Sequence, residues 1–184
     1  MGVLIYGVSS VRTLGVGLKH DKVGREWCLS SANAFSKDIT TIQDDDKNGS
    51  DNLSQIAAFL SAPGSGTTDD TGTTSNYPAF EFAITYSSTA TNLGTAYATG
   101  WYLPSIAELD KIYVNGKCVL KVFDIDAASA LCNGDTFSTS WYWSSSQYAS
   151  YDNFAYILNF YNGAWYDVSK HNGNYYVCAI RAFN

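Results

Sequence analysis

The stretch GWYLPSIAELDKIYVNG, residues 100–116, carries the strongest local fold signal in the chain. Ser105 followed by Glu108 forms a capping box, in which each side chain accepts a hydrogen bond from a backbone N–H of the first helical turn. Three apolar residues recur at helical spacing, namely Ile106, Leu109 and Ile112. Gly116 is a typical stop. The pattern predicts an amphipathic helix with one face on the core.

Upstream, the chain carries a second helix signal and a long polar segment. NLSQIAAFL, residues 52–60, spaces its apolar side chains for a one-sided helix, with Asn52 as cap and Gln55 as its reciprocal partner. Residues 61–78 are rich in Gly, Ser, Thr and Pro and predict an exposed loop, with an interdomain linker as the alternative. AFEFAITY, residues 79–86, fits either a strand or a short helix.

Downstream, the apolar period changes to two. FAYILNF and AWYDVSK alternate on either side of the turn signal Asn162-Gly163, which predicts a hairpin. HNGN predicts a second turn, and YYVCAIRAF one final strand, central in its sheet. KVFDIDAASALCNGD predicts a short strand and a helical turn, while VLIYGV and WCLS near the beginning are typical of strands. This layout predicts the α+β class.

Length and charge exclude several function classes. The 184 residues fit one domain, 1–184, long enough to bury a core of its own. With 17 acidic and 11 basic residues the net charge is −6, so we expect no nucleic-acid partner. No apolar run approaches the roughly 20 residues of a membrane helix, so we expect no membrane insertion. The opening residues lack signal-peptide features, as a trimmed chain also would.

The sequence offers little to catalysis. GxSxG and HExxH motifs are absent, and the two histidines, His20 and His171, lie far apart in sequence. Asp152 and Asp167 lie on the two sides of the predicted hairpin and would be near each other. Glycosidic hydrolysis needs a controlled separation of two carboxylates, which the sequence does not establish, so we expect two surface carboxylates. We therefore expect no enzyme and no cofactor.

Metal and disulfide chemistry stay open. Asp44, Asp46 and Asn48 alternate as in a calcium loop, but Gln55 stands where a bidentate Glu is expected, so a solvated acidic turn is the main alternative. An even number of cysteines permits two disulfides with three possible pairings, or buried thiols. They are Cys28, Cys118, Cys132 and Cys178.

The end of the chain, residues 142–183, has an unusual composition. It holds eight of the 14 tyrosines and only four fully charged side chains. Tyr and Trp supply large rigid contact area, while Ser, Gly and Asn add adaptable hydrogen bonds, as in antibody paratopes. Tyrosines that merely decorate a half-exposed sheet are the alternative. That alternative fits Tyr175 and Tyr176, but it fits less well the tyrosines expected in or beside turns: Tyr148, Tyr151, Tyr161 and Tyr166.

Three ordered motifs, GWYLPSIAEL, YWSSSQ and VCAIRAF, together resemble the C-type-lectin-like domains of bacterial surface proteins. They are similar in particular to the variable proteins of diversity-generating retroelements. The resemblance covers Gly100 to Phe183. It implies a C-type-lectin-like fold: two main helices beside short antiparallel sheets, with the first and last strands close together. It also implies that a reverse transcriptase rewrites adenines in the codons of a variable region, residues 142–183.

The resemblance implies a ligand-binding display protein whose partner is a protein or cell-surface molecule. The location would be the extracellular face of a bacterial envelope, or a phage particle. Scaffold positions would be Trp143, Ala155, Leu158, Phe160, Gly163, Trp165 and Lys170. The ligand-facing set would be Tyr148, Tyr151, Asp152, Asn153, Phe154, Tyr156, Tyr161, Ala164, Tyr166, Asp167, His171, Asn172 and Asn174.

The sequence departs from two relatives of that fold. The Glu-Pro-Asn, Gln-Pro-Asp and Trp-Asn-Asp motifs of sugar-binding C-type lectins are absent, so calcium-dependent sugar binding is not implied. Formylglycine-generating enzymes carry a terminal cysteine where Cys178 stands, but their catalytic cysteine segment has no match here. A bacterial surface adhesin or lectin-like module with a fixed ligand remains as the alternative, and an enzyme related to the formylglycine-generating enzymes is a further one.

Overall fold

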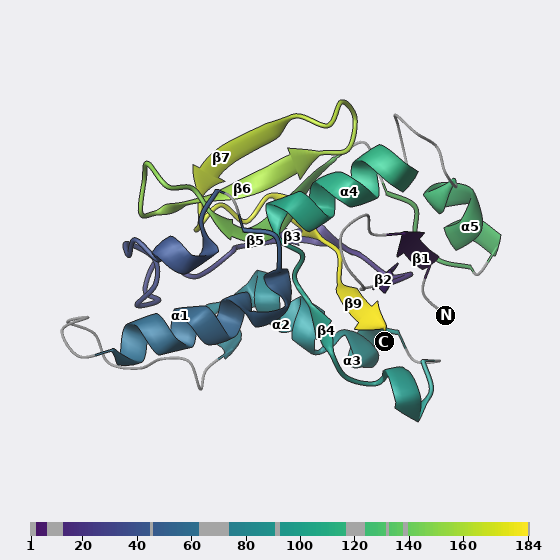
Figure 1. Ribbon diagram of the computed structural model, residues 1–184, viewed down its shortest axis with the longest axis horizontal. Coiled ribbons are helices and arrows are strands. Elements are labelled where there is room, and N and C mark those ends of the chain that lie inside the picture. The colour runs from purple at the N-terminus through teal and green to yellow at the C-terminus, as the bar shows by residue number, and fades with distance from the viewer. Residues whose placement is uncertain are drawn as a thin grey trace.

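The computed structural model describes residues 3–6, 13–44, 46–62, 74–90, 93–116, 124–131, 133–137 and 140–183. Its strands form two sheets, and with the helices they give the predicted mixed α+β architecture (Figure 1). The first sheet has the order β1 (Val3–Tyr6), β2 (Thr13–Val16), β9 (Ile180–Phe183), β4 (Trp101–Tyr102). The second has the order β3 (Asp21–Arg25), β8 (Tyr175–Val177), β5 (Trp141–Gln147), β6 (Phe154–Asn159), β7 (Trp165–Ser169).

All strand pairs are antiparallel except β5 with β8, which run parallel. The helices are α1 (Asn52–Ser61), α2 (Pro78–Ile84), α3 (Tyr86–Thr89), α4 (Ile106–Gly116) and α5 (Ile125–Leu131). Short 3-10 turns are η1 (Thr40–Ile42), η2 (Gly49–Asp51), η3 (Thr74–Asn76) and η4 (Thr95–Tyr97). The early strand β2 pairs with the last strand β9, so strands from the two ends of the chain lie together, as the resemblance implied.

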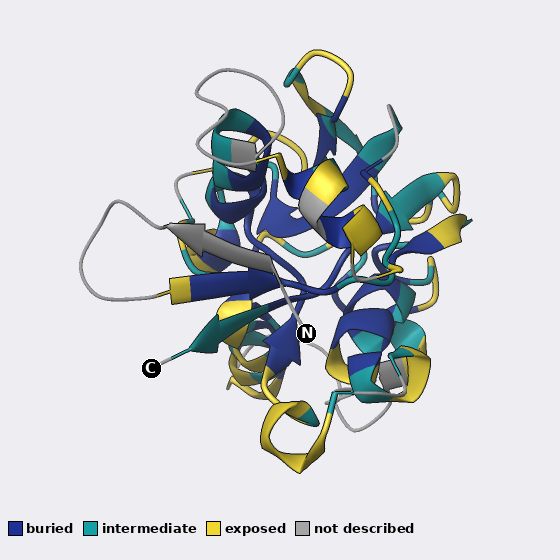
Figure 2. Ribbon diagram, turned by 90° about the vertical axis from the view of Figure 1, so that its right-hand side faces the viewer, coloured by how far each residue is buried: buried dark blue, intermediate teal, exposed yellow. Residues whose placement is uncertain are grey.

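The second sheet separates two hydrophobic cores because alternate side chains of a strand point to opposite faces. On one face, Tyr142 and Leu158 pack with the apolar stripe of α4. On the other, Trp143 and Ile157 pack with α1 and α2. Figure 2 shows buried residues along the strands and inward helix faces, and exposed residues mainly at the turns. Both faces of the central strands are therefore committed to the interior.

The helix predicted from the opening motif is confirmed. The Ser105 N–H donates to Glu108 Oε2 at 2.9 Å, and the Glu108 N–H donates to Ser105 Oγ at 3.3 Å, which completes the capping box. The helix predicted for residues 52–60 also forms, but its predicted cap was wrong. Asn52 is fully buried, and its Nδ2 donates to Asp46 and Ser145 at 2.6 and 2.7 Å. The local pattern assigned the Asn52 side chain to the helix end, but it forms a long-range hydrogen bond with Ser145 instead.

Several strand predictions need correction. The final apolar run is not one strand: it divides at Cys178 and Ala179 into β8 and β9, which belong to different sheets. WCLS lies after β3 in turns and irregular structure, and Trp27 and Cys28 are buried there. Residues 79–86 resolve as the helix α2 followed by the start of α3. The strand predicted from KVF falls on residues outside the described ranges, as does most of the loop 61–78.

Candidate functional site: an aromatic surface beside the last hairpin

Five rings on one side of the second sheet form a continuous series of contacts. We call them the aromatic surface: Tyr148, Tyr151, Phe154, Tyr156 and Trp165. Consecutive ring centroids lie 5.4 Å apart for Phe154–Tyr151, 5.9 Å for Tyr151–Tyr148, 5.5 Å for Tyr148–Tyr156 and 6.1 Å for Tyr156–Trp165. These separations are typical of favourable aromatic pairs, which pack edge to face or tilted. Tyr151 is 58% exposed and Trp165 43% exposed, so the surface is open to solvent.

The strand register explains why these rings share a face. Tyr156 pairs with Asp167 and Leu158 with Trp165 across β6 and β7, so Tyr156, Asp167 and Trp165 point to the same side. The same alternation sends Tyr166 to the opposite side, where its ring meets Trp141 at 4.9 Å in a T-shaped arrangement. Trp165, which the resemblance placed among the scaffold positions, is 43% exposed and lies on the aromatic surface.

Two carboxylates hold the polar edges of the aromatic surface. Tyr156 donates its hydroxyl to Asp44 Oδ1 at 2.9 Å, and the Ala149 N–H donates to the same oxygen at 2.9 Å. Burial, and next the bond to Asp44, raise the pKa of the Tyr156 hydroxyl. Trp165 Nε1 donates to Asp110 Oδ1 at 3.1 Å, which ties β7 to α4. Asp44 and Asp110 therefore fix the orientation of two rings from two distant segments of the chain.

The acidic loop around Asp46 is held to β5 and α1 by hydrogen bonds. Asp46 Oδ2 accepts from Asn52 Nδ2 at 2.6 Å and from Ser146 Oγ at 3.2 Å, and Asp46 Oδ1 accepts from the Asn48 N–H at 3.0 Å. Burial raises the pKa of Asp46. The carboxylate thus contacts protein donors on β5 and α1. Asp45 lies outside the described residues, and within them no group of three or more His, Cys, Asp and Glu side chains is placed to hold a metal ion.

Lys170 holds the loop that carries Tyr148 and Tyr151. Its side chain is fully buried, and Nζ donates to Asp152 O at 2.6 Å, Ala34 O at 3.0 Å and Gln147 Oε1 at 3.1 Å. Nζ also lies 4.9 Å from the ring centre of Trp27. Burial lowers the pKa of Lys170 from 10.5 to about 8. The resemblance placed this lysine among the scaffold positions, but no local signal revealed that it binds the loop of Tyr148 and Tyr151.

The remaining predicted residues separate into other locations. Tyr161 is 74% exposed in the turn between β6 and β7, near Ala164. Asp152 and Asn153 contribute backbone carbonyls to Lys170, through its Nζ and its N–H respectively. The structure therefore gathers only part of the predicted set on one surface, namely Tyr148, Tyr151, Phe154, Tyr156 and Asp167.

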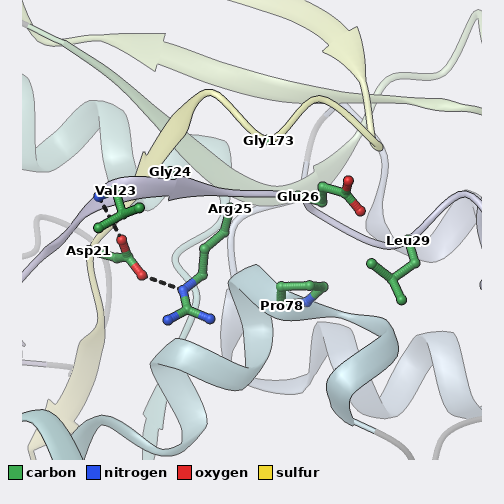
Figure 3. Close-up of a pocket in the computed structure, with 8 residues that line it drawn as sticks. All are labelled: Asp21, Val23, Gly24, Arg25, Glu26, Leu29, Pro78 and Gly173. Atoms are coloured by element: carbon green, nitrogen blue, oxygen red, sulfur yellow. Dashed lines mark hydrogen bonds and ion pairs between the residues drawn. The ribbon is translucent and has the colours of Figure 1, made fainter.

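His171, Asn172 and Asn174 form a second group in the turn before β8. His171 Nδ1 lies 3.1 Å from Glu26 Oε1, and Asn172 Nδ2 donates to the Tyr175 hydroxyl at 3.3 Å. The turn borders a shallow groove of about 510 Å³, shown in Figure 3. Its lining residues are Asp21, Val23, Gly24, Arg25, Glu26, Leu29, Pro78 and Gly173. Within this lining Arg25 pairs with Asp21, so the groove's own charges are partly matched.

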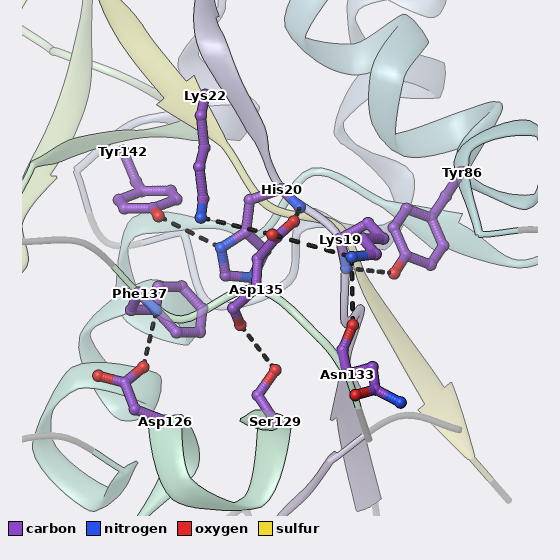
Figure 4. A network of polar contacts seen from close by, with 10 residues as sticks. All are labelled: Lys19, His20, Lys22, Tyr86, Asp126, Ser129, Asn133, Asp135, Phe137 and Tyr142. Atoms are coloured by element: carbon purple, nitrogen blue, oxygen red, sulfur yellow. Dashed lines mark hydrogen bonds and ion pairs between the residues drawn. The ribbon is translucent and has the colours of Figure 1, made fainter. Parts of the chain in front are cut away.

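The other histidine belongs to a separate buried network, shown in Figure 4. His20 Nδ1 lies 3.3 Å from the Tyr142 hydroxyl, and its ring centre lies 4.4 Å from that of Phe137. Its backbone N–H donates to Asp135 Oδ2 at 3.1 Å. Burial lowers the pKa of His20 from 6.5 to about 4, so the imidazole is neutral at pH 7. This histidine packs as a core side chain.

Two of the four cysteines lie in the described part of the chain. Cys28 and Cys178 are buried thiols in different cores, and burial raises the pKa of Cys178. Because Cys28 and Cys178 are both thiols, none of the three predicted sets of two disulfides forms, and Cys118 and Cys132 fall outside the described residues. None of the helices in the described ranges has the length and apolar character needed to cross a membrane.

Comparisons with known proteins give a structural neighbour and a family. The fold is similar to that of a fimbrial protein from Bacteroides ovatus ATCC 8483, with a TM-score of 0.59 and 15% sequence identity. The likeness covers 93% of this chain but only 36% of that protein, so the chain spans about a third of its neighbour's length. No curated protein matches. Residues 40–181, well over half of the chain, match the Lcl C-terminal domain family, and the chain belongs to that family.

Proposed function

We propose that this chain is a ligand-binding module of a bacterial surface protein and that the aromatic surface is its binding site. The observation that carries the proposal is the series of five touching rings beside the last hairpin, partly open to solvent. Rigid aromatic groups held by a packed sheet offer contact area at small entropic cost. The family match and the fimbrial neighbour support an adhesin-like role at the cell surface.

The finer part of the proposal is a C-type-lectin-like domain whose residues 142–183 a retroelement diversifies. The three sequence motifs support it, and so does the alternation within β6 and the following turn. Ala155, Leu158 and Phe160 are buried, whereas Tyr161 is exposed in the next turn, which supports a division into buried fixed positions and exposed variable ones. The partner would be a protein or cell-surface molecule, met outside a bacterial cell or on a phage particle.

A binding role, not a catalytic one, completes the proposal. Cys178, which stands where formylglycine-generating enzymes carry their terminal cysteine, is fully buried, and its raised pKa disfavours the nucleophilic thiolate. This supports a non-enzymatic module. An enzyme of that type would require its cysteine to be reachable by a peptide substrate.

The binding site is tested with two matched variants on opposite sides of the second sheet, one at Tyr151 in the loop between β5 and β6 and one at Tyr166 on β7. Fluorescently labelled chain is titrated onto intact bacterial and host cells, and Tyr151→Ala is compared with Tyr166→Ala. Both rings are more than half exposed, so neither change should unfold the protein. We expect Tyr151→Ala to lose most cell binding and Tyr166→Ala to retain it. Loss in Tyr166→Ala alone would move the site to the other face of the sheet.

Diversification is tested on the genome. A near-copy of the DNA for residues 142–183 should lie close to the gene, and it should differ from the gene at adenines of the copy. Differences spread over all four bases, or a region with no such copy, would contradict diversification and leave an adhesin with a fixed ligand.

A further inference from the structure

We propose that the aromatic surface takes a basic segment of a partner protein, in which arginine or lysine side chains lie over the rings. This inference rests on the proposed function and names the chemistry of its ligand. It follows from three features of the surface: which hydrogen-bonding groups it offers, which charges surround it, and where the chain's own cations are held.

The aromatic surface offers acceptors and ring faces, while two of its donors are already used. The Tyr156 hydroxyl and the Trp165 indole N–H both donate to carboxylates, at 2.9 and 3.1 Å. Carboxylates have no proton to give at neutral pH, and each has lone pairs beyond those used by these bonds. A ligand that complements this surface is therefore one that brings donors, and guanidinium and ammonium groups bring donors only.

Four carboxylates lie on or beside the rings, and the charge of one of them, Asp152, acts on the buried ammonium of Lys170. Asp44 and Asp110 bond to the rings, Asp167 shares the face of Tyr156, and Asp152 lies in the loop between Tyr151 and Phe154. In the described part of the chain, none of these four carboxylates forms an ion pair with a basic side chain. Carboxylates without an ion-pair partner on an open surface, as at Asp44, Asp110 and Asp167, attract a cationic partner and repel an anionic one.

Several of the chain's own cations are committed elsewhere. Lys170 is buried beneath the loop, Arg25 pairs with Asp21, and Arg181 lies 5.3 Å from the Tyr97 ring centre and 5.4 Å from that of Phe183. The placement of the Arg181 guanidinium over these two rings shows the geometry that we expect a partner's arginine to adopt over Tyr151 or Trp165. A cation within about 6 Å of a ring face is stabilised there, and more so when carboxylates lie at the ring edge.

The test uses three short peptides that share a glycine-rich backbone and carry arginine, glutamine or glutamate at the same alternate positions. Binding to the purified chain is measured by calorimetry at low and at high salt. We expect the arginine peptide to bind about tenfold more tightly than the glutamine peptide. The glutamate peptide should not bind, and added salt should weaken the arginine complex.

Charge-only variants locate the effect. Asp110→Asn and Asp167→Asn should each weaken arginine-peptide binding several-fold, since asparagine keeps an acceptor oxygen but loses the charge. Asp124→Asn is the matched control: Asp124 caps the N-terminus of α5, and asparagine caps equally well. Equal weakening by Asp124→Asn would mean that only the net charge matters, and it would overturn the inference.

The outcomes separate this inference from the proposed function. If no arginine peptide binds, or if the glutamine peptide binds as well, the basic-ligand inference fails. The proposed function still stands in that case, provided that Tyr151→Ala abolishes binding to cells. If neither cells nor peptides respond to Tyr151→Ala, both fail together.

Discussion

At the scale of single residues, Lys170 joins the loop of Tyr148 and Tyr151 to the rest of the fold. Its ammonium satisfies carbonyl oxygens from three separate segments, those of Ala34, Gln147 and Asp152. A methionine would fill a similar volume but leave these acceptors buried without a donor. We expect Lys170→Met to lower the free energy of unfolding by about 3 kcal/mol, measured by urea denaturation. A loss below about 1 kcal/mol would show that the loop is held by other contacts.

His20 gives the fold a defined acid sensitivity. Its pKa is about 4 in the folded chain and 6.5 in the unfolded chain, because burial disfavours the charged imidazolium. The unfolded state therefore binds the extra proton first as pH falls. Burial of the neutral His20 therefore stabilises the folded state fully above pH 6.5. As the pH falls towards 4, the free energy of unfolding decreases by about 3 kcal/mol.

The measurement for His20 compares unfolding free energies of the wild type and His20→Gln across this range. The variant should show a flatter pH dependence. Parallel curves for the two proteins would assign the acid sensitivity to other groups.

Sequence could identify some residues of the candidate site but not their partners. The tyrosine-rich composition pointed to Tyr148, Tyr151 and Tyr156, because composition is a property of the segment itself. Asp44 and Asp110 were missed as members of the site, since they reach it from segments 112 and 55 residues away from their ring partners. The resemblance placed Trp165 among the scaffold positions, and the sequence did not show that its ring is 43% exposed on the face it shares with Tyr156.

At the scale of elements, the turn between β6 and β7 has a strict steric requirement. Gly163 has φ of +73°, and a Cβ built there would collide with the Tyr113 ring of α4. Gly94 has a similar φ of +69° but open space around it. Both alanine variants are destabilised by the positive φ, and only Gly163→Ala also has a steric clash with α4.

We expect Gly163→Ala to lose about 1 to 3 kcal/mol more than Gly94→Ala, because the packed ring must shift. Thermal unfolding of the two variants side by side gives this difference directly. Equal losses would show that Tyr113 moves aside freely and that the hairpin is not braced by α4.

Elements with local signals were predictable, and those decided by distant contacts were not. The capping box of α4 was readable because its two residues lie three apart. The same Glu108 also accepts the Gly49 N–H at 3.0 Å and the Tyr102 hydroxyl at 3.0 Å, which no local pattern announces. The run YYVCAIRAF looked like one strand because both halves are apolar. Its first half, β8, pairs with β3 and β5, whereas its second half, β9, pairs with β2 and β4, and these distant partners place the halves in different sheets.

At the scale of the whole molecule, the fold separates positions that carry stability from positions free to change. Phe160 is 1% exposed between Tyr113 and Tyr142, while its neighbour Tyr161 is 74% exposed. We expect Phe160→Ala to lose about 3 to 5 kcal/mol and Tyr161→Ser less than about 0.5 kcal/mol. Denaturation of both variants measures this contrast. A large loss in Tyr161→Ser would contradict a surface whose residues can be exchanged without cost to the fold.

The division of the last apolar run has a mechanical consequence. In Figure 1 the β6–β7 hairpin lies along the upper side of the molecule and the C-terminal end of β9 on the lower side. Tension applied between a ligand on the aromatic surface and the end of β9 would pass through β6, β5 and β8 and then across the buried link Cys178–Ala179 into the first sheet. The force would then act on both hydrophobic cores, and Cys178–Ala179 would transmit it from the second sheet to the first.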